Sequence, residues 1–145
     1  MTKAVLDDHL LRDVIADDLG RELAQLLTDH QPATTNLYLF RLCRSVVSAR
    51  GGTLTGSWPL PLRRALGRSL VVLNDAIEIV PMRLLTYRMA EIANDHRVST
   101  LGAEAVAAAE YLQAPLCVWE GDDGPGIRAA SADLQMVYRT VGRER

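Results

Sequence analysis

The sequence is poor in cysteine and in aromatic residues, and it lacks any long apolar run. Only two cysteines occur in 145 residues, Cys43 and Cys117, and each lies alone within an apolar stretch. Two isolated thiols make no zinc site, and we expect them to be buried and reduced. No apolar run approaches the roughly eighteen residues that a membrane span needs, and the start of the chain has no secretory signal pattern. We therefore expect a cytoplasmic protein with no membrane partner.

Several common catalytic patterns are also missing. The sequence contains no His-x-x-x-His, no Cys-x-x-Cys and no Gly-x-Ser-x-Gly. The first apolar stretch, residues 4–6, runs into Asp7, Asp8 and His9 instead of a glycine-rich turn, which excludes a Walker or Rossmann nucleotide site there. His9, His30 and His96 each lie near the end of an expected helix, where a structural role is the ordinary one.

The charges are strongly polarised along the chain, although the net charge is only −2. Residues 1–31 carry three basic and seven acidic residues, whereas residues 32–75 carry six arginines and one aspartate. An arginine-rich segment can contact phosphates, and we take Arg41, Arg44, Arg63 and Arg64 as the candidate RNA-binding residues. The alternative is that these arginines pair with the acidic N-terminal segment.

Hydrophobic periodicity predicts an α/β domain. Apolar residues recur at helical spacing in several segments, and short apolar runs rich in β-branched residues separate these segments. The expected helices cover residues 8–27 (divided in two if Gly20 interrupts it), 37–49, 61–73, 83–96, 101–112 and 125–132, and the expected strands cover residues 3–7, 76–80, 116–119 and 136–140. Strands that alternate with helices form a mainly parallel sheet. The length suits one domain over residues 1–145.

Acidic residues follow two of the expected strands. Asp7 and Asp8 come after the first strand, and Glu120, Asp122 and Asp123 come after the strand at 116–119. Ligands of open parallel sheets bind at the carboxyl ends of the strands. Carboxylates that converge there could hold Mg²⁺ or Mn²⁺ and activate a water molecule. The alternative is that these acids are merely solvated turn residues.

The order of these segments resembles the PIN-domain family, particularly the small VapC-type ribonuclease toxins of bacterial toxin–antitoxin pairs. AVLDDHLL is similar to that family's first strand and first aspartate, which falls on Asp7, and IEIVP is similar to a later strand. VSTLGAEAVAAAEYLQAPLCVWEGDD is similar to the family's helix-strand block. The resemblance covers nearly the whole chain. It implies a PIN-like three-layer α/β/α fold with a mainly parallel sheet of four or five strands.

The resemblance implies four acidic positions, and two of them hold no acid here. The glutamate of the family's second helical unit is replaced by Arg41 or a neighbour, and the aspartate that opens the alanine-rich helix is replaced by Gly102. Glu104 lies about 200° further around that helix. The last aspartate is replaced by Glu120. The implied catalytic pair is Asp7 and Glu120, and the implied ligands of Mg²⁺ or Mn²⁺ are Asp7, Glu120, Asp122 and Glu104.

Three functional hypotheses follow. The first is a PIN-like domain with an incomplete acidic site that acts by binding RNA or an antitoxin-like partner protein, in a toxin–antitoxin or regulatory role. The second is a Mg²⁺-dependent VapC-like endoribonuclease. The third is a structural or regulatory homodimer that binds no nucleic acid and pairs through the helices at 37–49 and 60–73, because helix-mediated pairing is what the resemblance implies.

Overall fold

The computed structural model describes residues 2–143 and contains a five-stranded, entirely parallel sheet. The strands are β1 (Thr2–Leu6), β2 (His30–Thr34), β3 (Glu78–Ile79), β4 (Leu116–Trp119) and β5 (Tyr138–Val141). Their spatial order is β3-β2-β1-β4-β5. The chain therefore moves from β1 towards one edge through β2 and β3, and then crosses to the other side of β1 to form β4 and β5. The strand order reverses between β1 and β4.

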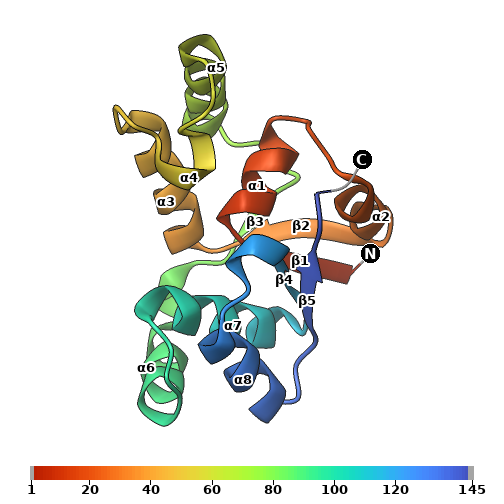
Figure 1. Cartoon of the computed structure of the whole chain (residues 1–145). Helices are drawn as coiled ribbons and strands as arrows, with labels where there is room; N and C mark the ends of the chain where they lie inside the picture. Colours follow the sequence, from red (N-terminus) through yellow and green to blue (C-terminus); the bar gives the residue numbers. More distant parts are fainter. Residues whose placement is uncertain (1, 144–145) are drawn as a thin grey trace.

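Helices cover both faces of this sheet and give the expected three layers. The helices are α1 (Asp8–Ile15), α2 (Arg21–Asp29), α3 (Asn36–Val47), α4 (Gly52–Thr55), α5 (Leu60–Val71), α6 (Thr86–Asp95), α7 (Thr100–Leu112) and α8 (Pro125–Asp133), with 3₁₀ turns η1 (Met82–Leu84) and η2 (Glu120–Asp122). Figure 1 shows α6, α7 and α8 below the sheet and α1 above it. No helix within residues 2–143 is both long and apolar enough to cross a membrane.

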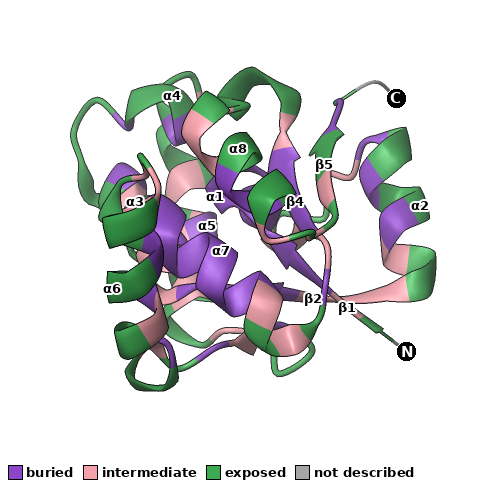
Figure 2. Cartoon of the chain, turned by 90° about the horizontal axis from the view of Figure 1, so that it is seen from below, coloured by how far each residue is buried: buried purple, intermediate pink, exposed green. Residues whose placement is uncertain are grey.

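Alternation along the central strands explains the two packed faces. Val5 and Leu116 pack with α7 and its neighbours in one core cluster, whereas Leu6 and Cys117 pack with α1 and α2 in another. Successive strand residues point to opposite faces, so each central strand supplies both clusters. Figure 2 shows the central strands and much of α7 in purple, as buried. This burial explains why α7 is alanine-rich, since small side chains let it lie close to the sheet.

A third core cluster extends the domain beside α1. Leu11 of α1 packs with Leu42, Leu54 and Leu66 from α3, α4 and α5. Trp58 packs against this cluster, and Tyr38 is buried with 3% of its surface exposed. Both aromatic residues therefore contribute to the core.

The sequence-based prediction missed β2 because this strand has an unusual composition. His30, Gln31 and Thr34 are polar, and Pro32 lacks the N–H that a central strand donates. Pro32 is tolerated because β3 pairs only with Ala33 and Thr34, which leaves Pro32 at an open edge. The segment at 50–60, predicted as a loop, holds the short helix α4.

Candidate metal centre

An acidic cluster lies where the strand order reverses. Asp7 and Asp8 follow β1, His9 is in the first turn of α1, and Asp122 ends η2 directly after β4. One ligand atom from each of these four side chains lies within 4.8 Å of the others. Because β1 and β4 are adjacent and parallel, their carboxyl ends deliver both acidic segments to one edge of the sheet. Ligands of doubly wound sheets bind at this kind of switch point.

Asp7 joins the two central strands. Its Oδ1 accepts a hydrogen bond of 2.9 Å from the Leu10 N–H and so caps α1, and its Oδ2 accepts one of 3.0 Å from the Trp119 N–H. Only 2% of Asp7 is exposed. Burial, with a smaller contribution from the nearby charge of Asp8, raises the pKa of Asp7 to about 7, although the two backbone N–H groups act in the opposite direction. The cluster therefore holds one carboxyl group poised near neutrality.

Asp8 has an oxygen that accepts no hydrogen bond. Its Oδ1 accepts a hydrogen bond of 3.0 Å from the backbone N–H of His9, whereas its buried Oδ2 has no hydrogen-bond donor. The nearest cationic atom to Oδ2 is Nε of Arg41, 3.4 Å away, at the distance of an ion pair. A buried carboxylate oxygen that accepts no hydrogen bond is only partly compensated for its desolvation by one ion pair with a half-exposed arginine. This oxygen is the atom of the cluster best prepared for a cation.

His9 connects Asp8 to Asp122. Its Nδ1 contacts Oδ2 of Asp122 and lies 3.5 Å from Oδ1 of Asp8. Its ring stacks on Trp119 with centroids 4.4 Å apart, which holds the ring in place. Burial opposes protonation of His9, but the hydrogen bond to Asp8 and the charges of the surrounding carboxylates outweigh it and raise the pKa of His9. A proton on His9 and a cation in the cluster would therefore compete for the same carboxylates.

The residues present fit a metal ion. Three carboxylates and one imidazole supply enough donors, Asp8 offers an oxygen without a hydrogen-bond donor, and Asp122 leaves one side of the cluster open because 40% of its side chain is exposed. The raised pKa of Asp7 reflects the cost of gathering carboxylates in a buried place, and a divalent cation would reverse that cost.

The two other candidate acids point elsewhere. Glu104 is fully buried in α7. Its carboxylate accepts hydrogen bonds from two groups at the start of α3, the Leu37 N–H at 2.9 Å and Asn36 Nδ2 at 3.5 Å. Glu120 is exposed, and its Oε2 would lie 3.3 Å from a Cβ placed on Gly142, near the end of β5. The cluster of four includes Asp7 and Asp122 from the predicted set of ligands, and neither Glu104 nor Glu120 belongs to it.

The four candidate RNA-binding arginines lie in different surroundings. Arg41 and Arg44 are exposed on α3 and line a pocket of about 230 Å³. Arg63 instead donates to carbonyl groups at the end of α3, including those of Ser45 at 3.3 Å and Val46 at 3.2 Å, so its guanidinium caps that helix. Arg64 is exposed on α5. Only Arg41 reaches the acidic cluster, through Asp8.

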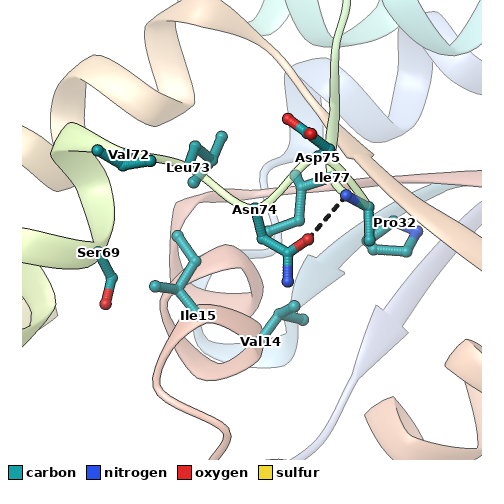
Figure 3. Close-up of a pocket in the computed structure, with 10 residues that line it drawn as sticks. Val14, Ile15, Pro32, Ser69, Val72, Leu73, Asn74, Asp75 and Ile77 are labelled. Atoms are coloured by element: carbon teal, nitrogen blue, oxygen red, sulfur yellow. Dashed lines mark hydrogen bonds between the residues drawn. The ribbon is translucent and has the colours of Figure 1, made fainter.

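A larger cavity of about 540 Å³ lies at the opposite end of α1. One part of it is lined by Val14, Ile15, Pro32 and Leu73. Asn74 also lines it, and the side-chain oxygen of Asn74 accepts a hydrogen bond of 2.9 Å from the Ala76 N–H (Figure 3). Asp75 is its only lining residue with an ionisable side chain. This cavity therefore has no group of converging donors like that of the acidic cluster.

Sequence reasoning missed His9 as a member of the cluster. The available signal was its position immediately after two aspartates at a strand end, where the N-terminal turn of the following helix faces the site. No protein-family model matches the sequence, and no curated protein matches it either. The molecule is thus defined by its fold and site: a doubly wound α/β domain with a candidate cation site at the switch point.

Proposed function

We propose that the protein is a PIN-like domain that binds RNA, with a divalent cation held by the acidic cluster and with the exposed face of α3 in contact with the phosphate backbone. The observation that carries this proposal is the position of Asp8. Its carboxylate belongs to the cluster and also lies 3.4 Å from Arg41 Nε. A cation site and an exposed arginine face therefore meet at one residue, and both attract phosphate oxygens.

The cation would be held by Asp7, Asp8, His9 and Asp122. Carboxylates suit both Mg²⁺ and Mn²⁺, whereas an imidazole nitrogen favours a transition-metal ion, so this donor set suits Mn²⁺ better. When bound, the ion would supply positive charge that attracts a phosphate oxygen. Asp7 orients the site by joining α1 to β4, and the stack of His9 on Trp119 keeps the imidazole directed at Asp8 and Asp122.

The test is the salt dependence of RNA binding. We expect the affinity for a single-stranded RNA to fall steeply with salt, because each phosphate contact releases counterions. Arg41→Gln should weaken binding and make the slope of log K against log salt shallower by about 1, whereas Arg68→Gln on the exposed side of α5 is the matched control. A wild-type protein that binds RNA with no dependence on salt, or that binds none with or without Mn²⁺, would refute the proposal.

A metal-dependent endoribonuclease is the second candidate, favoured by the Asp8 oxygen that has no hydrogen-bond donor. A cation there could lower the pKa of a bound water and generate a nucleophile. We then expect Mn²⁺- or Mg²⁺-dependent cleavage of structured RNA that is lost in Asp7→Ala and Asp8→Asn. Glu120→Gln separates the two acidic arrangements: lost cleavage would support the catalytic pair that the resemblance implies, and retained cleavage would support the observed cluster.

A protein partner, either antitoxin-like or a second copy of the chain, is the remaining part of the proposal. It is favoured by an apolar groove of about 160 Å³ between α3 and α5, lined by Cys43, Val46, Val47, Gly67, Leu70 and Val71. Val47 and Val71 are 85% and 84% exposed. Sedimentation of wild type and Val47→Glu tests self-association: a dimer that dissociates in the variant supports the homodimer, and a wild-type monomer at high concentration excludes it.

A further inference from the structure

The pocket between α3 and α4 has a rigid wall. The buried hydroxyl oxygens of Ser45 and Thr55 lie 2.8 Å apart, and the Thr55 hydroxyl donates a hydrogen bond of 3.2 Å to the Ser45 carbonyl. The Ser45 hydroxyl donates in addition to the Gly51 carbonyl. Gly51 has φ +66°, and a Cβ there would lie 2.8 Å from the backbone of Gly56, so only glycine fits. These contacts hold the turn between the two helices in one conformation.

The pocket is also cationic. Arg41 and Arg44 line it together with Ser48, Gly52 and Thr53, and no acidic residue is among the residues that line it. Arg44 forms no ion pair with any carboxylate in residues 2–143, whereas Nε of Arg41 pairs with Oδ2 of Asp8 at 3.4 Å. Arg41 and Arg44 contribute exposed guanidinium groups, which only donate hydrogen bonds, and Ser48 and Thr53 contribute hydroxyl groups, which both donate and accept. This combination of donors suits an oxyanion.

The size of the pocket limits the ligand. Its volume of about 230 Å³ is below the roughly 300–1,000 Å³ of cavities that enclose a drug-sized molecule. A single phosphate group fits such a space better than a whole nucleotide. Arginine also recognises phosphate through two parallel hydrogen bonds, which favours phosphate over a monovalent anion.

We propose that this pocket is a phosphate-binding site that seats one backbone phosphate of the RNA, held by Arg41 and Arg44. The inference rests on the proposed function, since RNA is the source of the phosphate. Because Arg41 also pairs with Asp8, a cation at Asp8 releases the Arg41 guanidinium towards the pocket. Phosphate and divalent cation therefore bind with positive coupling, and by linkage each raises the affinity of the other by the same factor.

The experiment titrates inorganic phosphate and follows the side-chain Nε–H signals of the arginines by NMR, with and without Mg²⁺ as a diamagnetic probe. We expect the signals of Arg41 and Arg44 to shift together, at lower phosphate concentration when Mg²⁺ is present, while that of Arg68 stays unchanged. Arg44→Gln should abolish the shift of Arg41 and weaken binding of a single-stranded RNA about fivefold to tenfold, the effect of roughly one phosphate contact. Its thermal unfolding should match that of wild type, because Arg44 is exposed.

The outcomes separate the pocket from the proposed function. Equal shifts of all exposed arginines, or none at Arg44, would overturn the phosphate site, and so would RNA binding unchanged in Arg44→Gln. Phosphate shifts confined to Arg41 and Arg44 in a protein that binds no RNA would support the phosphate site and overturn RNA as its source.

Discussion

Oδ2 of Asp7 accepts a hydrogen bond of 3.0 Å from the backbone N–H of Trp119, 112 residues further along the chain. This bond joins the end of β1 to the end of β4, and Oδ1 of the same carboxylate caps α1. One side chain thus positions the strand end, the helix start and the acidic segment that carries Asp122. A residue with this structural role is also the buried carboxyl group whose pKa is raised to about 7.

The raised pKa of Asp7 predicts that stability falls as the pH rises. The unfolded chain releases this proton near pH 4, whereas the folded protein keeps it until about pH 7. Between these values the folded state binds more protons, so the free energy of unfolding decreases by up to about 1.4 kcal/mol per pH unit from this group. The raised pKa of His9 acts in the same direction. Urea unfolding at pH 5, 6, 7 and 8 measures this decrease.

The carboxyl carbon of Asp7 provides the direct check by NMR. We expect a midpoint near pH 7 for Asp7 in the folded protein and one near pH 4 for the same carbon in urea-unfolded protein. A midpoint below pH 5 for Asp7 would contradict the effect of burial described here.

Mn²⁺ should stabilise the protein through the acidic cluster. A ligand that binds only the folded state raises the free energy of unfolding by about 2.7 kcal/mol at a concentration of 100 times Kd. We expect Asp8→Asn to lower the affinity for Mn²⁺ more than tenfold, since even changes outside the ligand shell cost roughly 10–100-fold. Calorimetric titration measures this affinity. Asp29→Asn, an exposed acid remote from the cluster, is the control, and equal loss in both variants would show that the ion binds non-specifically.

Glu104 should act on stability and leave metal affinity unchanged. Its carboxylate is the buried acceptor for the Leu37 N–H. Glu104→Ala leaves this donor unpaired and opens a cavity, so we expect a loss of about 2–4 kcal/mol in the free energy of unfolding. Glu104→Gln retains an acceptor oxygen and should cost less, with the Mn²⁺ affinity of wild type. If Glu104→Gln instead abolished Mn²⁺ binding, the ligand role implied by the PIN-like resemblance would be supported against the observed cluster.

A buried ion network beneath Trp58 should be important for stability. Arg12 is 3% exposed, and its Nε donates a hydrogen bond of 3.0 Å to the carboxylate of Asp13. Asp13 is itself buried and also forms an ion pair of 3.3 Å with Arg143. Burial raises the pKa of Asp13, and the two arginines act against it. Arg12→Ala leaves a buried carboxylate with one partner and should cost about 3 kcal/mol in urea unfolding.

The exposed Arg68→Ala is the matched control for this network, with an expected change within about 0.5 kcal/mol. An effect of Arg12→Ala no larger than that of Arg68→Ala would show that Arg143 alone compensates Asp13.

The local pattern of the sequence was enough to predict most elements of the fold. Apolar residues at helical spacing mark α1, α3 and α7. Thr35 and Ser99 cap α3 and α7, since each hydroxyl accepts a hydrogen bond from the backbone N–H of the third residue of the helix. The strand at 116–119 was predicted at its observed bounds. These features depend on residues within a few positions of one another, which is why sequence suffices for them. The sequence did not predict β2, because the burial of this strand depends on its neighbours in the sheet and not on its own composition.

The site was decided by long-range geometry. The sequence determined that Asp7 and Asp122 come shortly after strands, and the parallel arrangement of β1 and β4 then brought them together. It could not indicate that Glu104 turns to the start of α3, because that depends on the rotation of α7 against the sheet. Nor could it show that Arg63 caps α3 while Arg41 reaches Asp8. The sequence alone determined which segments are apolar and which carry charge, whereas side-chain direction and pairing required the packed structure, because contacts between distant segments set both.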